Sequence, residues 1–433
     1  MSDITVGILG LVCLLALFLT GIELAFAMTI VGFLGFSYLV SFKAGLNLLA
    51  KDFFDVLASY GFTVIPLFVL MGQIAFNAGI ARKLYDSSYK FIGHIPGGLA
   101  IATVAGATAF KAICGSSPAT AATFASVAVP EMERYKYDKR LSTGIVATVG
   151  TLGILIPPSV TLIVFGIITE QSIGKLFLAG IIPGLLIALF FVLIIYGWCK
   201  INPELGPKGE RFSWKERVKT LPEVLWVAAI FLLVVGGLMK GLFTPTEAGS
   251  IGTFVVLLAT VIKRDLNFKG FVKSVTESLR TACMVLLLIA GSTVLGHFLT
   301  RTKIPMIAAD WIVSLPLDRN LIMVIISFVY LLGGSFIDDL AFMVLATPIF
   351  YPAIIKLGYD PLWFGMIIAI TVMIGVVIPP VAINVFVVRA ITKTPMSVIY
   401  RGVLPFLLSL VVCAALLFIF PRMATYLPSL LMR

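Results

Sequence analysis

Long apolar runs separated by short polar connectors make up most of the chain. Runs near the roughly 20 residues that a helix needs to cross a bilayer occur at 4–22, 24–41, 62–79, 176–199, 222–239, 246–262, 281–299 and 400–420. Transmembrane strands would give shorter segments of alternating hydrophobicity, and the chain lacks that pattern. We therefore predict an all-α polytopic membrane protein.

Composition and charge support this class. The 433 residues are 60% hydrophobic and 12% charged, with a mean hydropathy of +1.10, far outside the range of soluble domains. The formal net charge of +11 does not predict nucleic-acid binding, because the bases lie in short connectors with no basic domain. Five scattered cysteines without a CxxC spacing and two histidines predict neither a disulfide framework nor a transition-metal site, and we expect no cofactor.

The chain contains an internal repeat with an offset of 222 residues. The segment GILIPPSV at 153–160 returns as GVVIPPVA at 375–382. Further matches at this offset are Pro130 with Pro352, Gly180 with Gly402, and Pro183 with Pro405. Such self-similarity predicts two related halves, which we place at 1–200 and 222–433, joined by a polar linker at 201–221.

Basic connectors predict how the halves are oriented. Most lysines and arginines lie in the connectors 80–94, 133–140, 200–219 and 263–280, which the positive-inside rule assigns to the cytoplasm. The leader MSD has an acid and no base, so we interpret the first apolar run as a span rather than as a secretion signal, with a periplasmic amino terminus. The halves then run in opposite directions, as in the inverted repeats of secondary transporters.

Each half also contains an apolar stretch that helix-breaking residues interrupt, at 97–132 and at 320–355. In the first, the limb from Leu99 to Ala112 would reach only about 21 Å as a helix, short of the roughly 30 Å hydrocarbon core. Its tip, Gly115–Pro118, is a turn sequence. In the second, breaks are predicted at Gly333–Ser335 and at Asp338–Asp339. We predict two re-entrant hairpins that enter from opposite sides and meet at a binding site, because broken backbone at membrane depth must be covered by protein or line a cavity.

The Pro-Pro pairs break two further helices, at 141–170 and 361–392. Proline has no amide to donate to the carbonyl four residues earlier. The carbonyls that should be freed are those of Gly153, Ile154, Gly375 and Val376. The half-helix before each break ends in carbonyls that suit a cation, and the half-helix after it begins with amides that suit a carboxylate. A lone proline usually makes only a kink, but a repeated pair opposite a repeated hairpin favours a functional break.

We predict one cation site in each half. The first combines the hydroxyls of Ser116, Ser117 and Thr120 with carbonyls of Gly153 and Ile154. The second combines Ser335, Asp338 and Asp339 with carbonyls of Gly375 and Val376. The hydroxyls have an alternative role in helix packing, whereas acids at the bilayer centre are costly and normally functional. Oxygen-only ligands favour Na⁺, with H⁺ as the alternative at the aspartates.

An organic anion would fit between the two tips. Lys111 and Arg389 are candidates to neutralise its carboxylate, and Ser159 and Asn384, which follow the Pro-Pro pairs, are further candidates for contact with it. Both basic residues have a second interpretation, in which they snorkel to the membrane interface.

Other classes of protein fit less well. An intramembrane aspartyl protease needs facing carboxylates on separate helices, whereas Asp338 and Asp339 are adjacent. The sequence has no H-E-x-x-H, no G-x-x-x-x-G-K-[ST] and no selectivity-filter repeat. We therefore expect a secondary transporter rather than an enzyme, a channel or an ATP-driven pump.

Taken together, the motifs resemble a known family. CGSSPATAA at the first tip, GILIPPS followed by LFLAGIIPG, GVVIPPVAINVF and the closing YRGVLPF are similar to the large membrane subunit of tripartite ATP-independent periplasmic (TRAP) transporters of the dicarboxylate or sialic acid type. The resemblance covers essentially the whole chain.

This resemblance implies Na⁺-driven import of an organic acid across the bacterial inner membrane, by an elevator-like movement of hairpins and broken helices against a scaffold. It also implies two partners, a separate four-span membrane subunit and a periplasmic substrate-binding protein. The alternative is a Na⁺/dicarboxylate symporter or ion antiporter of similar two-hairpin fold that works without a binding protein.

Overall fold

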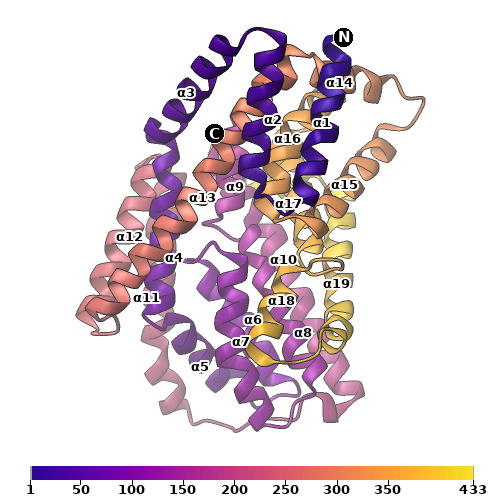
Figure 1. Cartoon of the computed structure of the whole chain (residues 1–433). Helices are drawn as coiled ribbons and strands as arrows, with labels where there is room; N and C mark the ends of the chain where they lie inside the picture. The colour runs from indigo at the N-terminus through magenta and orange to yellow at the C-terminus, as the bar shows by residue number, and fades with distance from the viewer. Residues whose placement is uncertain (1, 433) are drawn as a thin grey trace.

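The computed structural model describes residues 2 to 432, and over this range the regular structure is entirely helical (Figure 1). The elements up to the linker are α1 (Asp3–Leu19), α2 (Leu24–Leu39), α3 (Phe42–Ala58), η1 (Tyr60–Thr63), α4 (Val64–Asn77), α5 (Ile80–Ile92), α6 (Gly98–Lys111), α7 (Ser117–Arg134), α8 (Lys139–Val149), η2 (Gly150–Ile154), α9 (Val160–Ile168) and α10 (Ile173–Ile201). The remaining elements are η3 (Pro203–Leu205), α11 (Trp214–Met239), α12 (Pro245–Ile262), α13 (Phe268–Arg301), α14 (Ile304–Ser314), α15 (Arg319–Phe336), α16 (Asp339–Lys356), α17 (Pro361–Gly375), α18 (Ile383–Thr392), α19 (Met396–Ile419) and α20 (Arg422–Leu431).

Eight helices within the described range are long and apolar enough to cross a membrane, which confirms a polytopic membrane protein. They include all the predicted runs from 62–79 onward. The first two predicted runs form shorter helices, α1 with 17 residues and α2 with 16. α1 ends before a turn in which Gly21 adopts a φ of +85° that favours glycine, whereas α2 begins at Leu24 as predicted and ends at Leu39.

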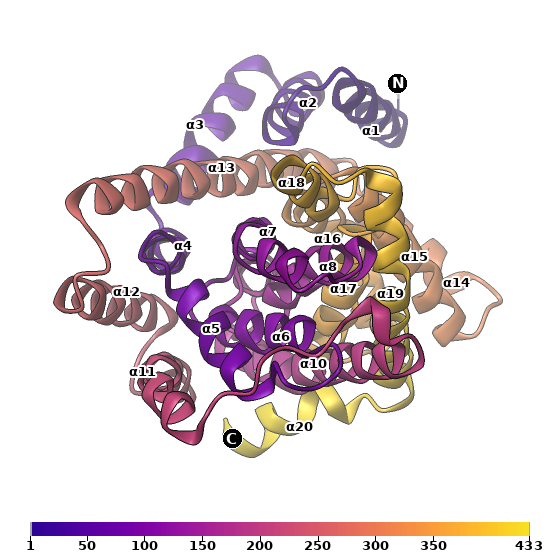
Figure 2. The same cartoon turned by 90° about the horizontal axis from the view of Figure 1, so that it is seen from below.

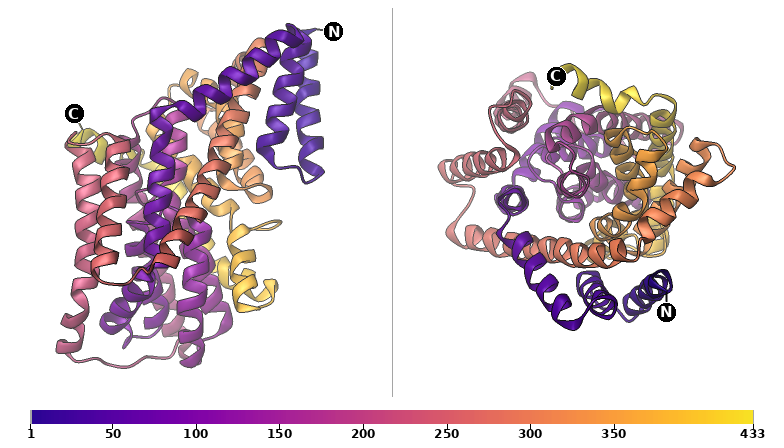
Figure 3. Two further views of the ribbon diagram at one scale, coloured as in Figure 1. Left: turned by 60° about the vertical axis from the view of Figure 1, so that its left-hand side comes forward. Right: turned by 90° about the horizontal axis from the view of Figure 1, so that it is seen from above.

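One helix is much longer than its apolar run predicts. The run 281–299 is the second half of α13, whose 34 residues correspond to about 51 Å of helix. This exceeds the roughly 30 Å of hydrocarbon, and α13 runs obliquely across one side of the molecule (Figure 3). The preceding segment is polar, so hydropathy alone detects only the part that resembles a span.

The helices form an outer layer and an inner group. In the outer layer, α4 packs on both α12 and α13. Helices α1, α2 and α3 lie on the outer side of α13, and α2 packs along it (Figure 2). The inner group mixes the two parts of the chain, because α18 packs on α7, α19 on α8 and α16 on α9.

A small-residue crossing brings α8 and α19 together. A Cβ on Gly144 would overlap the backbone of Gly402, and one on Gly402 would overlap the carbonyl of Arg140. Such close backbone approach is typical of helix packing in membranes. It connects an early helix directly to a late one.

The chain is not helical at the two hairpin tips or at either Pro-Pro pair. The first tip is 112–116, between α6 and α7, and the second is 337–338, between α15 and α16. The predicted break at Gly333–Ser335 is wrong, because these residues belong to α15, where the amide of Ile337 still donates to the carbonyl of Gly333. Gly333 serves packing instead, since a Cβ there would overlap the ring of Phe342.

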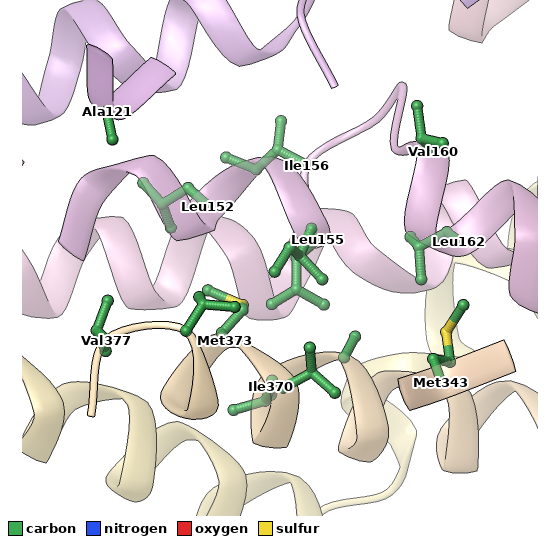
Figure 4. Close-up of a cluster of buried hydrophobic side chains, with 14 of the residues drawn as sticks. Ala121, Leu152, Leu155, Ile156, Val160, Leu162, Met343, Ile370, Met373 and Val377 are labelled. Atoms are coloured by element: carbon green, nitrogen blue, oxygen red, sulfur yellow. The ribbon is translucent and has the colours of Figure 1, made fainter. Parts of the chain in front are cut away.

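The two Pro-Pro segments, 155–159 and 376–382, follow η2 and α17. Both Pro-Pro peptide bonds are cis. An apolar cluster lies between the two regions, and Leu155 of the first segment faces Met373 and Ile370 of α17 (Figure 4). These side chains are almost completely buried, so the core of the inner group is built directly around the breaks.

Candidate functional site

A cavity of about 250 Å³ lies where the two hairpin tips, the first Pro-Pro break and the outer layer meet. The outer layer contributes Phe68, Val69, Gly72 and Gln73 from α4 and Thr281, Met284 and Val285 from α13. The inner group contributes Cys114, Gly115, Ser116, Ser117 and Pro118 at the first tip, Ile154, Val160 and Thr161 at the break, and Asp338, Asp339 and Leu340 at the second tip. Of the predicted site residues, the cavity therefore brings together Ser116, Ser117, Ile154, Asp338 and Asp339.

Three helices begin at this cavity. Each has a polar residue before its first turn, whose side chain accepts a hydrogen bond from a backbone amide: Ser116 from Ala119 at 3.3 Å for α7, Ser159 from Leu162 at 3.3 Å for α9, and Asp338 from Leu340 at 3.2 Å for α16. Helix N-termini carry a partial positive charge and unpaired amides. The cavity is therefore a favourable environment for an anion.

The two aspartates at the second tip provide the opposite charge. Asp339 is 7% exposed and accepts a hydrogen bond from Thr161 Oγ1 at 3.4 Å. Within residues 2 to 432, no lysine, arginine or histidine lies within ion-pair distance of Asp338 or Asp339. A buried carboxylate such as that of Asp339, with the half-buried carboxylate of Asp338 beside it, is costly without an ion-pair partner, so the second tip has chemistry that suits a cation.

The remaining groups predicted for the second cation are close to this tip. Ser335 Oγ donates to the carbonyl of Leu332 at 2.7 Å, and the Ser335 carbonyl accepts from the amide of Val381 at 3.0 Å. The end of α15, next to the second tip, also contacts the end of α17, next to the second break, since Gly375 lies against the backbone of Gly334.

The expectation that the Pro-Pro pairs leave four unpaired carbonyls is wrong for three of them. The Ile154 carbonyl accepts from Ser159 Oγ at 2.7 Å, the Val376 carbonyl from the Asn384 amide at 3.3 Å, and the Gly375 carbonyl from the Ile378 amide at 3.4 Å. Ser159 and Asn384, which follow the Pro-Pro pairs, and Ile378, which precedes the second pair, thus replace the donors that proline lacks. Each carbonyl has two lone pairs, so one acceptor position remains on each.

The hydroxyls predicted for the first cation are engaged with protein groups. Ser116 Oγ caps α7, and Thr120 Oγ1 donates to the Ser116 carbonyl at 3.0 Å. Ser117 Oγ is hydrogen-bonded to the Asn384 side chain, which also donates to the Ala147 carbonyl at 3.0 Å. Asn384 is fully buried and bridges the second break to the first hairpin, so it does not line the cavity as a substrate ligand would.

The structure also separates the other predicted substrate ligands from the cavity. Arg389 is exposed and lines a different surface pocket with Phe386 and Lys393. Ser159 is buried and closes the first break. Lys111 lies behind the first tip, fully buried, with its Nζ donating to the Ser116 carbonyl at 2.7 Å. In this arrangement none of these three side chains lines the cavity, so the prediction that they contact a substrate there does not fit.

Sequence reasoning missed the outer-layer wall of the cavity. Gln73 lines it, and its Oε1 is buried without a hydrogen-bond partner among the described residues. Its signal was an amide side chain within an otherwise apolar run. Thr281 and Met284 had no such signal, because their role depends on how the long helix α13 crosses the tips.

An all-helical membrane protein in which helix termini and broken backbone surround a cavity with two acidic side chains has the architecture of a secondary transporter. The sequence matches the family described as "Tripartite ATP-independent periplasmic transporter, DctM component" over residues 11–423. The chain belongs to this family of large permease subunits and is a transport protein rather than an enzyme.

Similar proteins include two large permeases. The C4-dicarboxylate TRAP transporter large permease DctM of Pseudomonas aeruginosa is 36% identical over 382 residues, covering 88% of this chain and 89% of that protein. The sialic acid TRAP transporter large permease SiaM of Vibrio cholerae is 31% identical over 418 residues, covering 96% and 97%.

A solved structure shares the fold. The YdaH transporter of Alcanivorax borkumensis superposes with a TM-score of 0.55 at 14% identity, covering 89% of this chain and 90% of that one. At this identity the likeness concerns the fold alone.

Proposed function

We propose that this chain translocates a small organic acid anion of the C4-dicarboxylate or sialic acid class, coupled to Na⁺. The observation that carries the proposal is one cavity in which three helix N-termini meet two carboxylates without a basic partner. The helix termini favour an anion, and the carboxylates require a cation. A site with both properties binds its anion best together with a cation.

Coulomb's law gives the physical reason for coupling. An anionic substrate entering the cavity would meet the charges of Asp338 and Asp339, and like charges at short range cost several kcal/mol at the low effective dielectric of a protein interior. A cation at these aspartates removes that repulsion. The residues that would hold Na⁺ are Asp338, Asp339 and Ser335, with the second acceptor positions of the Gly375 and Val376 carbonyls.

The size of the cavity supports a small solute. Its volume of about 250 Å³ is below the roughly 300–1,000 Å³ of sites for drug-sized ligands. The relatives named above transport C4-dicarboxylates and sialic acid by their names, which makes these acids the first candidates here.

The family suggests how the solute reaches the cavity. We propose a separate small membrane subunit and a periplasmic substrate-binding protein as partners, and a location in the bacterial inner membrane with a periplasmic amino terminus. We further propose an inverted repeat of the halves 1–200 and 222–433 and an elevator mechanism, in which the hairpins and broken helices move against the outer layer. The position of the cavity between these two groups supports this division.

Reconstitution tests the function. The chain, its small subunit and the cognate binding protein are placed in proteoliposomes, and uptake of labelled C4-dicarboxylate and sialic acid is measured. We expect an inward Na⁺ gradient to raise uptake at least tenfold over K⁺, and removal of the binding protein to abolish it. Uptake driven by a pH gradient without Na⁺ would instead assign the coupling to H⁺. Full uptake without the binding protein would support the binding-protein-independent symporter.

A further inference from the structure

The side chain of Lys111 occupies the position that the sequence predicts for the first cation. Its Nζ donates to the carbonyl of Ser116 at 2.7 Å. The end of the side chain also lies directly against Gly153, where a Cβ would overlap Nζ, Cδ and Cε. Ser116 and Gly153 both belong to the predicted ligand set of the first half, and Lys111 is 0% exposed.

No acid in the described part of the chain forms an ion pair with this ammonium, although Asp339 is near enough for its charge to act on it, and helix ends surround its side chain. Within residues 2 to 432, no carboxylate lies at ion-pair distance from Lys111. Lys111 is the last residue of α6, and the residue it packs against, Gly153, is in the last turn of η2. Helix C-termini carry a partial negative charge from unpaired carbonyls. Dipoles of this kind are what a Na⁺ ion would use.

The Ser116 carbonyl has no acceptor position left for a second cation. It already accepts hydrogen bonds from Lys111 Nζ at 2.7 Å and from Thr120 Oγ1 at 3.0 Å, and a carbonyl oxygen has two lone pairs. The ammonium also carries a full positive charge that repels another cation at this position. The residues present therefore do not fit a Na⁺ ion in addition to Lys111.

The side chains at the two hairpin tips carry charges of opposite sign. α6 ends with a lysine, whereas α15 has no basic residue in its last turn and is followed by Asp338 and Asp339. The first tip thus carries its own cation and the second carries two anions. Only the second tip requires a mobile ion.

We propose that the Lys111 ammonium is a tethered cation that replaces the coupling ion in the first half, so that the chain binds Na⁺ only at Asp338 and Asp339. This inference rests on the Na⁺ coupling proposed above. Its consequence is that fewer Na⁺ ions accompany each substrate than two symmetrical sites would give.

The test is the stoichiometry of ²²Na⁺ binding, which does not depend on turnover. The purified permease with its small subunit is placed in nanodiscs, and saturable binding is measured for the wild type, Lys111→Ala, Lys111→Met and the double variant Asp338→Asn/Asp339→Asn. Lys175→Ala, which removes an exposed lysine at the start of α10, is the matched control. Thermal melting verifies that each variant is folded.

We expect one Na⁺ per chain for the wild type and for Lys175→Ala, none for the double variant, and two for Lys111→Ala. Lys111→Met should stay at one, because its thioether fills the space without offering a suitable ligand. A folded Lys111→Ala that still binds one ion overturns the proposal. If Lys111→Ala does not fold, the wild type and the double variant provide the test. Two Na⁺ ions bound to the wild type, one of which remains bound in the double variant, would also overturn the proposal. A wild type that binds no Na⁺ while Lys111→Ala binds one would refute Na⁺ coupling but retain the role of Lys111.

Discussion

A carboxylate at the centre of a membrane helix is costly, at about 2.5 kcal/mol or more for an aspartate, and the second tip of this membrane protein has two carboxylates in its central cavity. Their environment supplies backbone amides and the Thr161 hydroxyl, and within the described range no basic side chain lies at ion-pair distance from them. The local structure therefore stabilises a negative site that a cation completes. This is why the acids, rather than the hydroxyls of the first tip, are the residues on which ion coupling should depend.

Neutralising these acids separately tests their roles. In Asp338→Asn and Asp339→Asn we expect the Na⁺ concentration for half-maximal uptake to rise at least tenfold, because a lost charge interaction of about 1.4 kcal/mol corresponds to a factor of ten. The measurement is uptake in proteoliposomes against Na⁺ concentration. The control is Asp310→Asn, an exposed acid that pairs with Lys356. An unchanged Na⁺ response in both site variants would refute the assignment of the second cation site.

At the scale of elements, the end of α15 before the second tip and the end of α17 before the second break are in direct backbone contact. A Cβ on Gly375 would lie 2.7 Å from the Gly334 carbonyl carbon, closer than real side chains come, so α15 would have to move. A Cβ on Gly334 would lie 3.7 Å from Val372, an ordinary contact. The same interface therefore offers one glycine that cannot be replaced and one that can.

We expect Gly375→Ala to reduce Na⁺-driven uptake about tenfold or more, since it displaces the tip that carries Asp338 and Asp339, and Gly334→Ala to retain most activity. Alanine in the helical environment of Gly334 should even add roughly 0.5–1 kcal/mol of stability. Uptake and thermal melting of both variants are the measurements. Equal loss of uptake in the two would show that the contact between α15 and α17 does not control the site.

At the scale of the whole molecule, the cavity divides helices that we propose move relative to one another. α4 in the outer layer meets the first hairpin tip at Gly72, where a Cβ would lie 3.7 Å from the Cβ of Cys114. This is within the roughly 3.5–4.5 Å typical of disulfides. A Gly72→Cys variant would thus place a second thiol opposite a native one.

Oxidation of Gly72→Cys should form a bond to Cys114 and stop uptake, and a reducing agent should restore it. The measurement is uptake before and after treatment with copper phenanthroline, with the bond verified by mass spectrometry. Gly72→Cys combined with Cys114→Ala is the control and should keep its activity under oxidation. A cross-linked protein that still transports at the full rate would exclude movement of the first tip against α4.

Much of this architecture follows from the sequence because its causes are local. Hydrocarbon requires about 20 apolar residues per helix, so the long runs locate the spans. Proline removes a donor wherever it stands, so both Pro-Pro pairs predict an interruption, and the chain is non-helical at both. Acids within an apolar stretch predict a site at Asp338 and Asp339, and these residues line the cavity.

Tertiary structure decided what depends on neighbours distant in the chain. The carbonyls at the breaks were predicted to be unpaired, but Ser159 and Asn384 fold back to donate to two of them. Gln73 and Thr281 became cavity walls only through the packing of α4 and α13 against the tips. Arg389 and Lys111 carry the same charge in the sequence, yet one lies at the surface and the other is buried against Gly153. The sequence determines which charged and polar side chains are present. The helices packed around a long side chain determine the direction in which it points.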